Sequence, residues 1–407
     1  MREVSERLPR AIMLEPLDAA LAVTRRLHPR RVPVDMVGRR SWFMRTRFAT
    51  SHFVGGLPLA RDEWLACLSE LARDGNGVLI PGSDPATEFV VKERSRIPER
   101  LRSFEAPGSA HLKLMDKASL YAHARDVGVR VPWTLQLGSR AELDRVLAEA
   151  RYPCLLKPAV AHHWRRMFGE WRVLFLHGPD DLVREAGPAL DAGLELLVTE
   201  HVPGNDRHLE GVTVIRDSNG SYPLAYGRRK VRAYPPGFGT ASILESADVP
   251  ETMDLTARLL DAAGFVGIAA AEVKRHAHTG ERMLIEINVR IPRGFALGDA
   301  CGVDASWRLY AVLAGIPLRP QPPARSGVKV VVPSMEPRAA VASLMRRRLT
   351  LRELLASYRG VRSLSGLSLR DPAPSVWFSI RQFRHGRRFG GRRQLGPSSP
   401  ESDGEST

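Results

Sequence analysis

Residues 283–294, "MLIEINVRIPRG", carry the pattern from which the architecture of this chain is best inferred. Branched aliphatic side chains alternate there with polar ones, in the order Ile285, Glu286, Ile287, Asn288, Val289 and Arg290. In a β-strand, residues two apart share a face. The stretch therefore predicts a strand with one apolar face and an opposite face that presents a carboxylate, an amide and a guanidinium in a row.

The sequence just before this strand predicts its partner. "GFVGIAAAEVKRHAHTGERMLIEINVR" (264–290) reads as a hairpin with "HTG" at the turn, which sets Glu272 beside Glu286. Two carboxylates on neighbouring strands repel each other unless something neutralises them. Ligands that all offer oxygen favour Mg²⁺, with Mn²⁺ as the alternative ion. We expect Glu272, Glu286 and Asn288 to be the metal ligands; the competing interpretation is a solvent-facing strand with scattered polar residues.

The lysines are the second signal, because the chain has only seven of them and 53 arginines. Lys157 lies inside the apolar strand "PCLLKP" (153–158), where an ammonium group is costly unless it meets an anion. Lys117 belongs to the first turn of a predicted helix, and Lys230 and Arg232 follow a hairpin that turns at Asn219-Gly220. Convergence on one polyphosphate would explain these four cations, although Lys117 alone also fits a solvated helix residue.

"VTEHVPGND" (198–206) is an apolar strand that runs into a polar turn. Such a strand end would suit an adenine ring, with Glu200 and the backbone of His201 and Val202 along its edge and Asp206 in reach of ribose hydroxyls. An ordinary strand end is the alternative interpretation.

In this order, Lys117, "YPCLLKP", "LLVTEHVPGND", "RKVRAYP", "AAAEVK" and "LIEINVR" resemble the motifs of the ATP-grasp superfamily, over roughly residues 10–320. Within it, the chain looks like the carboxylate–amine ligase branch that includes D-aspartate ligase-like enzymes. The resemblance implies a Rossmann-like α/β domain followed by a two-subdomain ATP-grasp fold, hence a mixed α/β and α+β class. Val289 stands where relatives carry Pro, and the loop "AVAHHWRRMFGE" (159–170) is poorer in glycine than theirs.

The resemblance also implies roles for these residues. Lys117 and Lys157 would contact the α- and β-phosphates of ATP. Lys230, with Arg232, would meet the terminal phosphates. Arg290 would face the carboxylate substrate and its phosphorylated form.

The activity implied is that of an ATP- and Mg²⁺-dependent ligase, which activates a carboxylate as an acyl phosphate and joins it to an amine. Two alternatives stay open at this point. One is an ATP-grasp carboxylase or a ligase that uses another nucleophile. The other is a non-catalytic protein of this fold that binds membrane surfaces through its basic C-terminus.

The domain organisation follows from the alternation of strand and helix patterns. Residues 10–40 predict strand, helix and strand, 64–75 a helix and 77–84 a buried strand with its turn, which is typical of a parallel sheet. The GxGxxG dinucleotide fingerprint is absent from the first turn, "EPLD". We predict a first domain over 1–112, an ATP-grasp domain over 113–320 with its lid at about 130–200, a basic helical extension over 321–393 and a disordered tail over 394–407.

Composition favours a globular cytoplasmic protein. The chain is 43% hydrophobic and 26% charged, with no apolar run of membrane-spanning length and three cysteines that form no CxxC pair. Net charge is +15, and residues 336–393 account for most of it, with 14 arginines and three acids.

The basic segment "SVWFSIRQFRHGRR" (375–388) predicts an amphipathic helix. Such a helix over 375–393 suits peripheral contact with the inner face of an anionic membrane, or docking onto the enzyme itself. No recognition motif accompanies the charge, so nucleic acid is not an expected partner.

Overall fold

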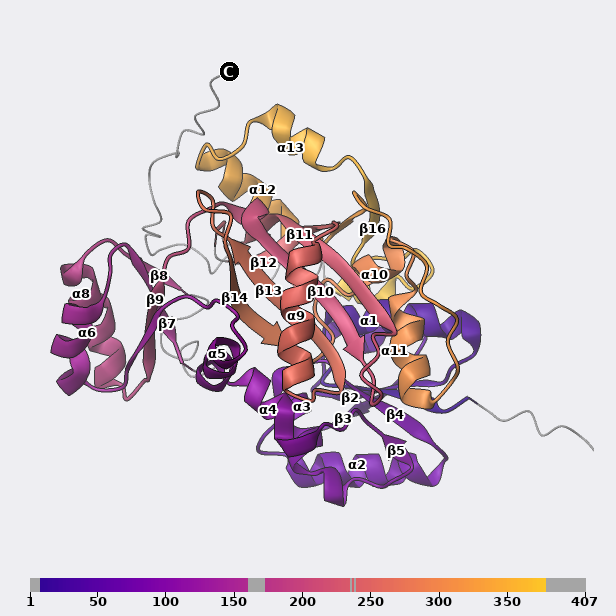
Figure 1. Ribbon diagram of the computed structural model, residues 1–407. Helices are drawn as coiled ribbons and strands as arrows, with labels where there is room; N and C mark the ends of the chain where they lie inside the picture. The colour runs from indigo at the N-terminus through magenta and orange to yellow at the C-terminus, as the bar shows by residue number, and fades with distance from the viewer. Residues whose placement is uncertain (1–7, 160–172, 235, 238, 378–407) are drawn as a thin grey trace, which may run out of the picture.

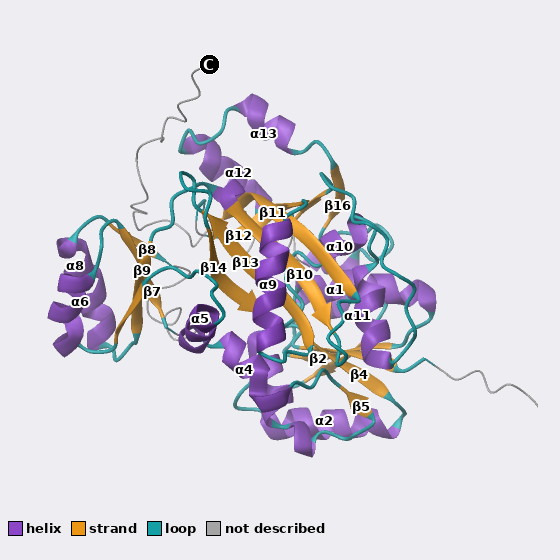
Figure 2. Cartoon of the chain, viewed as in Figure 1, coloured by secondary structure: helices purple, strands orange, loops and turns teal. Residues whose placement is uncertain are grey.

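The computed structural model describes residues 8–159, 173–234, 236–237 and 239–377 (Figures 1 and 2). Three β-sheets are formed in turn by the N-terminal, middle and C-terminal parts of this chain. In Figure 1 the N-terminal sheet lies below the largest sheet, and the smallest sheet stands apart on the left. The glycine-poor loop over 159–170 lies, from residue 160 on, outside the described residues.

The N-terminal sheet is parallel, with the strand order β3-β2-β1-β4-β5. Its elements are β1 (Arg10–Leu14), α1 (Asp18–Leu27), β2 (Val34–Gly38), β3 (Thr50–Phe53), α2 (Arg61–Arg73), β4 (Gly77–Pro81), α3 (Asp84–Lys92) and β5 (Leu101–Arg102). Residues 11–14 are completely buried, as expected for a parallel strand covered on both faces. The predicted strand, helix and strand over 10–40, the helix within 64–75 and the strand from Gly77 are confirmed.

The smallest sheet is antiparallel, with the strand order β6-β9-β7-β8. It comprises β6 (Thr134–Leu137), α6 (Leu143–Glu149), β7 (Cys154–Pro158), β8 (Leu174–Leu176), α8 (Pro179–Asp191) and β9 (Leu196–Glu200). Leu156 and Val198 pack in one core with α6 and α8, which cover the outer face (Figure 1). Because side chains alternate along a strand, Lys157 and Thr199 belong to the opposite face.

The largest sheet has seven strands in the order β14-β13-β10-β11-β12-β15-β16. It contains β10 (Leu209–Arg216), β11 (Leu224–Tyr234), β12 (Thr240–Ser246), β13 (Gly267–Arg275), β14 (Arg282–Asn288), β15 (Lys329–Val331) and β16 (Val361–Leu364). Both predicted hairpins, β10–β11 with its turn at Asn219-Gly220 and β13–β14, are confirmed.

Helices cover both faces of this sheet. They are α4 (Ala110–Met115), α5 (Lys117–Asp126), α9 (Pro250–Ala262), α10 (Ala296–Ala300) and α11 (Ala305–Ala314). One core unites α4, α5 and α9 with the apolar face of β10, β13 and β14. A second core joins α10 and α11 to α1 and the N-terminal sheet, so the first domain and the large sheet pack as one body.

The predicted helical extension is more integrated than expected. Its helices α12 (Glu336–Met345) and α13 (Leu351–Ser357) are present, but β15 and β16 complete the edge of the large sheet. Sequence reasoning missed these strands because they are only three and four residues long. Most of the predicted basic helix, from residue 378 on, lies outside the described residues. No helix in the described ranges is long and apolar enough to cross a membrane.

Asp371 fastens this C-terminal segment to the first domain. Its carboxylate is fully buried and accepts bonds from Arg25 (Nη2 at 2.9 Å), the Thr46 hydroxyl (2.7 Å) and the Arg47 amide (3.2 Å). Asp371→Ala leaves the Arg25 charge without its partner, and losing one member of a buried pair costs about 3–5 kcal/mol. We expect the free energy of unfolding to fall by about 3 kcal/mol in chemical denaturation.

Arg370→Ala is the matched control, because Arg370 is the exposed neighbour of Asp371. It should leave the denaturation midpoint near that of the wild type. Equal midpoints for both variants would contradict the fastening role of Asp371.

Candidate functional site

The hairpin β13–β14 aligns the predicted metal ligands. Glu272 pairs directly with Glu286, and Ala270 pairs with Asn288, so both carboxylates and the amide share one face. This face is opposite the one that packs on α9. The expected row of oxygen ligands is therefore present on the two strands.

One detail of the expected alternation is wrong. Leu284, and not Ile285, pairs with Val273, so a β-bulge interrupts the register beside Glu286. Leu284 is fully buried in the core, whereas Ile285 is only half-buried. Val289, the residue that departs from the family pattern, is 3% exposed and packs in this core.

A lysine and an amide contact the paired carboxylates. Lys230 Nζ lies 2.8 Å from Glu272 Oε2, and the Asn288 amide donates to Glu286 Oε1 at 3.1 Å. Burial alone would raise the pKa of Glu286, but Lys117, Asn288 and Lys230 together hold it below its ordinary value. Glu286 therefore stays ionised in a half-buried position.

Arg290 extends the polar row towards the first domain. Its guanidinium donates to Asn288 Oδ1 at 2.9 Å and to Asp84 Oδ1 at 2.7 Å. Asp84 begins α3, directly after the turn that follows β4. Sequence reasoning missed Asp84, although its place after a buried strand of a parallel sheet was a usable signal.

Lys117 and Lys157, the two lysines predicted to bind the α- and β-phosphates, lie near Glu286 of the hairpin. Lys117, Tyr121, Thr134, Lys157, Leu197 and Thr199 line a small cavity between α5 and the antiparallel sheet. Burial, with a smaller effect of the nearby Lys117 charge, lowers the pKa of Lys157 to about 7, and Glu286 opposes this shift. An anion bound beside Lys157 would stabilise its charged form and raise its pKa again.

Tyr121 is a further residue that the sequence did not reveal. Its hydroxyl donates to the carbonyl of Ile285 at 3.0 Å, at the bulge. Burial raises the pKa of Tyr121, and the nearby Glu286 charge adds to the effect. The bond ties α5, which carries Lys117, to the strand of Glu286.

The strand end at Glu200 has the expected mixture of buried and polar groups. Glu200 Oε2 accepts from the Trp133 amide at 3.2 Å, Val202 is 6% exposed, and the His201 ring meets Phe175 edge to face at 4.9 Å. The chain after Glu200 leads from β9 of the small sheet to β10 of the large sheet.

Asp206 has a different environment from the one expected. Its two carboxylate oxygens accept from the backbone amides of Ala233 (3.1 Å) and Gly237 (2.9 Å). Lys274, another residue that was missed, donates to the carbonyls of Gly204 (2.5 Å) and Asn205 (2.9 Å). These bonds hold the turn after Glu200, and the contact of Asp206 with ribose hydroxyls stays a prediction.

Arg232 has a different environment from the one expected, and its catalytic role stays a prediction. Lys230 pairs with Leu244 and Arg232 with the adjacent Ile243, so an irregular register turns these two cations to opposite faces. The Arg232 side chain is 2% exposed and pairs with Glu336, with Ser357 Oγ at 2.6 Å. Arg232 therefore binds α12 and α13 to the back of the sheet.

The candidate metal site combines two carboxylates with one amide. Among the residues that the structure describes, no three His, Cys, Asp or Glu side chains lie close enough together to hold a metal ion. Glu272 and Glu286 each use one oxygen in the contacts described above, which leaves Glu272 Oε1 and Glu286 Oε2 for a cation. Oxygen ligands with few carboxylates are the set that Mg²⁺ prefers, so these residues fit that ion.

No family model and no curated protein matches the sequence. Solved structures do match. An N5-carboxyaminoimidazole ribonucleotide synthetase in complex with ADP is 16% identical, with a TM-score of 0.65, over 84% of this chain and 85% of that one. The Staphylococcus aureus N5-carboxyaminoimidazole synthetase with ADP is 10% identical, with a TM-score of 0.63, over 86% and 87%.

A third similar structure is the biotin carboxylase domain of the Hydrogenobacter thermophilus 2-oxoglutarate carboxylase, with MgADP and bicarbonate. It is 17% identical, with a TM-score of 0.60, over 80% of this chain and 74% of that one. The finer resemblance to D-aspartate ligase-like enzymes stays a prediction. The TM-scores of 0.60 to 0.65 show a shared fold, so the mixed α/β class is confirmed and the chain has the ATP-grasp fold.

Proposed function

We propose that this protein is an ATP- and Mg²⁺-dependent ligase that activates a carboxylate as an acyl phosphate and joins it to an amine. One observation carries the proposal: three lysines from three separate elements approach a hairpin that presents two carboxylates and an amide. The charges of Lys117 and Lys230 both act on half-buried Glu286, and the charge of Glu286 acts on Lys157. Such a cluster is costly to bury unless ligands complete it.

In this proposal the lysines bind the nucleotide. Lys117 and Lys157 contact the α- and β-phosphates from the side of the small sheet, and Lys230 contacts the terminal phosphate from the large one. Glu200, His201 and Val202 line the adenine. Because its oxygens already accept backbone bonds, Asp206 acts by fixing the turn that places them.

The acyl transfer is assigned to the polar row of β14. Glu272, Glu286 and Asn288 hold Mg²⁺, which would draw charge from the phosphate oxygens during transfer. Arg290 orients the carboxylate substrate beside them, since a guanidinium binds a carboxylate through two parallel bonds. The carboxylate oxygen takes the terminal phosphoryl group, and the amine then displaces phosphate. This chemistry needs positioning and charge neutralisation more than a protein nucleophile.

A carboxylase is the second candidate, and the structural neighbours favour testing it. Two of them are named as carboxyaminoimidazole synthetases, and a third holds bicarbonate beside MgADP. Bicarbonate in the place of the organic acid would use the same groups, with Arg290 binding the anion.

The test is a coupled measurement of ADP release over pairs of carboxylates and amines, with a bicarbonate series beside it. The ligase predicts release that requires one acid, one amine and Mg²⁺, and a hydroxamate when hydroxylamine replaces the amine. Release that requires bicarbonate alone with the amine would favour the carboxylase. Release in no combination, together with no ATP binding, would refute both.

A further inference from the structure

The outer face of the C-terminal segment, residues 336–377, differs in composition from the rest of the surface. Nine of the twelve large apolar side chains that are exposed in the described residues belong to it, although it is a small part of the chain. All eight of its arginines are exposed as well. The segment therefore combines exposed apolar area with a strong positive charge.

The acids of this segment do not balance that charge at the surface. Glu336 and Asp371 are buried within the ion pairs described above. Glu353 is exposed, but its carboxylate accepts from the amide (2.7 Å) and the hydroxyl (2.8 Å) of Thr350 at the start of α13. Positive charge therefore dominates the outer face.

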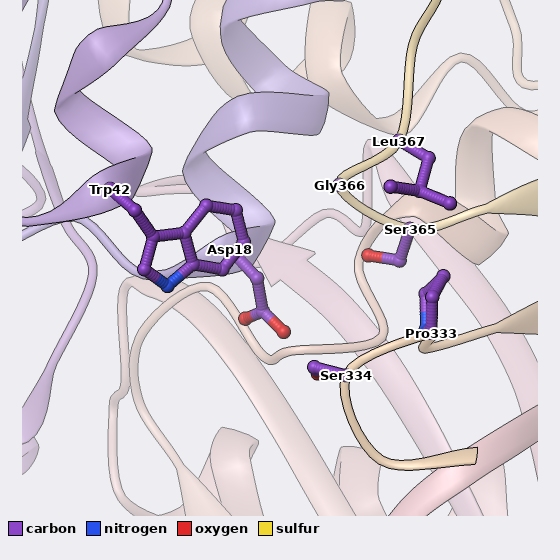
Figure 3. A pocket seen from close by; sticks show the side chains of 7 residues that line it. All are labelled: Asp18, Trp42, Pro333, Ser334, Ser365, Gly366 and Leu367. Atoms are coloured by element: carbon purple, nitrogen blue, oxygen red, sulfur yellow. The ribbon is translucent and has the colours of Figure 1, made fainter. Parts of the chain in front are cut away.

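The inner side of the same segment is closed by packing. Figure 3 shows the loops after β15 and β16 against Asp18 and Trp42 of the first domain. The space that remains between them is about 10 Å³, which holds one water molecule at most. The outer face is therefore the side of the segment that is open to an interaction.

Helices α12 and α13 present this composition on adjoining faces. Val341 and Met345 are four residues apart on α12 and are 55% and 79% exposed, and Leu351 and Leu355 are four apart on α13 and each 63% exposed. Residues four apart share a helix face. Residues 346–348, all exposed arginines, begin the link between the helices. Figure 1 shows both helices at the end of the large sheet opposite the N-terminal sheet. We call these four apolar residues and the arginines around them the α12–α13 surface.

One of these arginines occupies a position that suits glycine. The φ angle of Arg347 is 52°, in the left-handed region. Its amide donates to the Leu344 carbonyl at 3.0 Å, and the amide of Arg348 donates to that of Ser343 at 2.9 Å, which is the helix ending that usually carries glycine here. A side chain is strained in this conformation. Folding alone would favour glycine at 347, so an exposed arginine there supports a use for its charge.

The mixture of side chains favours a lipid surface over nucleic acid. The four exposed large apolar side chains of α12 and α13 are all aliphatic. Leucine and similar side chains enter the boundary between headgroups and acyl chains, while arginines beside them attract anionic lipids. Interfaces with duplex DNA are more polar, and single strands are bound by stacking on aromatic rings. The charge and the apolar tips together match an anionic membrane.

We propose that the α12–α13 surface binds an anionic lipid membrane, with Met345, Leu351 and Leu355 at the acyl boundary and the arginines at the headgroup phosphates. The contact is peripheral, since only side chains of two surface helices enter the lipid. This inference goes beyond the ligase proposal and does not depend on it, because the surface is separate from the lysines and the metal ligands.

Sedimentation of the full chain with lipid vesicles measures this binding. One set of vesicles contains equal parts of phosphatidylcholine and phosphatidylglycerol, and the other contains phosphatidylcholine alone. We expect binding to the anionic vesicles that weakens as salt screens the charges, and much weaker binding to the neutral ones. No binding to the anionic vesicles, or equal binding to both sets, overturns the inference.

Arg347→Gly tests the charge at the α12–α13 surface. It should weaken binding to the anionic vesicles about five-fold, and adding Arg352→Gln should bring the loss to about 30-fold. Arg31→Gly is the matched control, because Arg31 is also exposed and has a φ of 58°, at the turn between α1 and β2. Glycine suits both positions, so neither variant should melt below the wild type, which separates lost binding from lost folding. An equal loss in Arg31→Gly, or no loss in Arg347→Gly, overturns the assignment to this surface.

The double variant Met345→Gln/Leu355→Gln tests the apolar contribution. It should weaken binding to the anionic vesicles about 10-fold, whereas Leu59→Gln, at a position of the first domain that is 96% exposed, should bind as the wild type does. A loss with the arginine variants alone would assign the surface to a soluble polyanion such as nucleic acid, and overturn the membrane. A dimer without lipid that the double variant dissolves in sedimentation velocity would assign it to a second copy, with the same consequence.

ADP release separates this inference from the ligase proposal. All these variants should keep wild-type ADP release without lipid, since none of the substituted residues belongs to the proposed active site. Vesicle binding that depends on Arg347, in a protein that releases no ADP, would refute the ligase and leave the membrane contact standing. Normal ADP release without vesicle binding would have the opposite meaning.

Discussion

Glu286→Gln is expected to lower ADP release about 100- to 1000-fold, the range seen when one electrostatic contact to the transferring group is lost. The substitution keeps the shape of the side chain and its bond with the Asn288 amide within reach, but it removes the negative charge that a divalent cation needs. Lys117, Asn288 and Lys230 hold the pKa of Glu286 below its ordinary value, so its carboxylate is ionised and able to bind a cation. The loss should therefore appear mainly as a higher Mg²⁺ requirement.

The measurement is ADP release against Mg²⁺ concentration, with Mn²⁺ as a second ion. Glu281→Gln serves as the control, since Glu281 lies at the turn of the same hairpin and forms an ion pair with exposed Arg130, at 2.8 Å. Partial rescue of Glu286→Gln by higher Mg²⁺ would locate the defect in metal binding. Wild-type turnover at low Mg²⁺ would remove Glu286 from the metal site.

The polar face of β14 was predictable because a period-two pattern fixes which side chains point together, whatever packs around them. Glu286 and Asn288 do share a face, and Glu272 pairs with Glu286 as the hairpin spacing implied. The ATP-grasp fold was equally predictable, since it rests on the order of several motifs. Strand pattern and motif order are local properties, and the sequence contains them directly.

Features that depend on register or on distant contacts were not predictable. The irregular pairing between β11 and β12 turns Arg232 away from Lys230, although the two are separated by a single residue. The partners of Arg232 are Glu336 of α12 and Ser357 of α13, which follow it by more than a hundred residues in the sequence. The position of Asp371 was not predictable either, because its hydrogen-bond partner Thr46 belongs to the first domain. Ser365 likewise lies beside Asp18 and Trp42 of that domain.

Lys157→Met is expected to weaken ATP binding about 10- to 100-fold, because a hydrogen bond between charged groups contributes about 1.5–3 kcal/mol. The wild-type affinity should also fall as the pH rises through about 7, where the free protein loses the charge of Lys157. A bound polyphosphate favours the charged form, so binding above this pH should take up a proton. Calorimetry in two buffers of different ionisation enthalpy measures that uptake directly.

The variant should lose both the proton uptake and the pH dependence, whereas Lys113→Met, at an exposed position of α4, should keep them. Stability supplies an independent check with a defined sign. Burial lowers the pKa of Lys157 from 10.5 to about 7, so between these values the unfolded chain binds more protons than the folded one. The free energy of unfolding of the wild type, relative to Lys157→Met, must then rise with pH across that interval. A flat difference would mean that Lys157 is solvated, and its assignment to the phosphates would lose its physical basis.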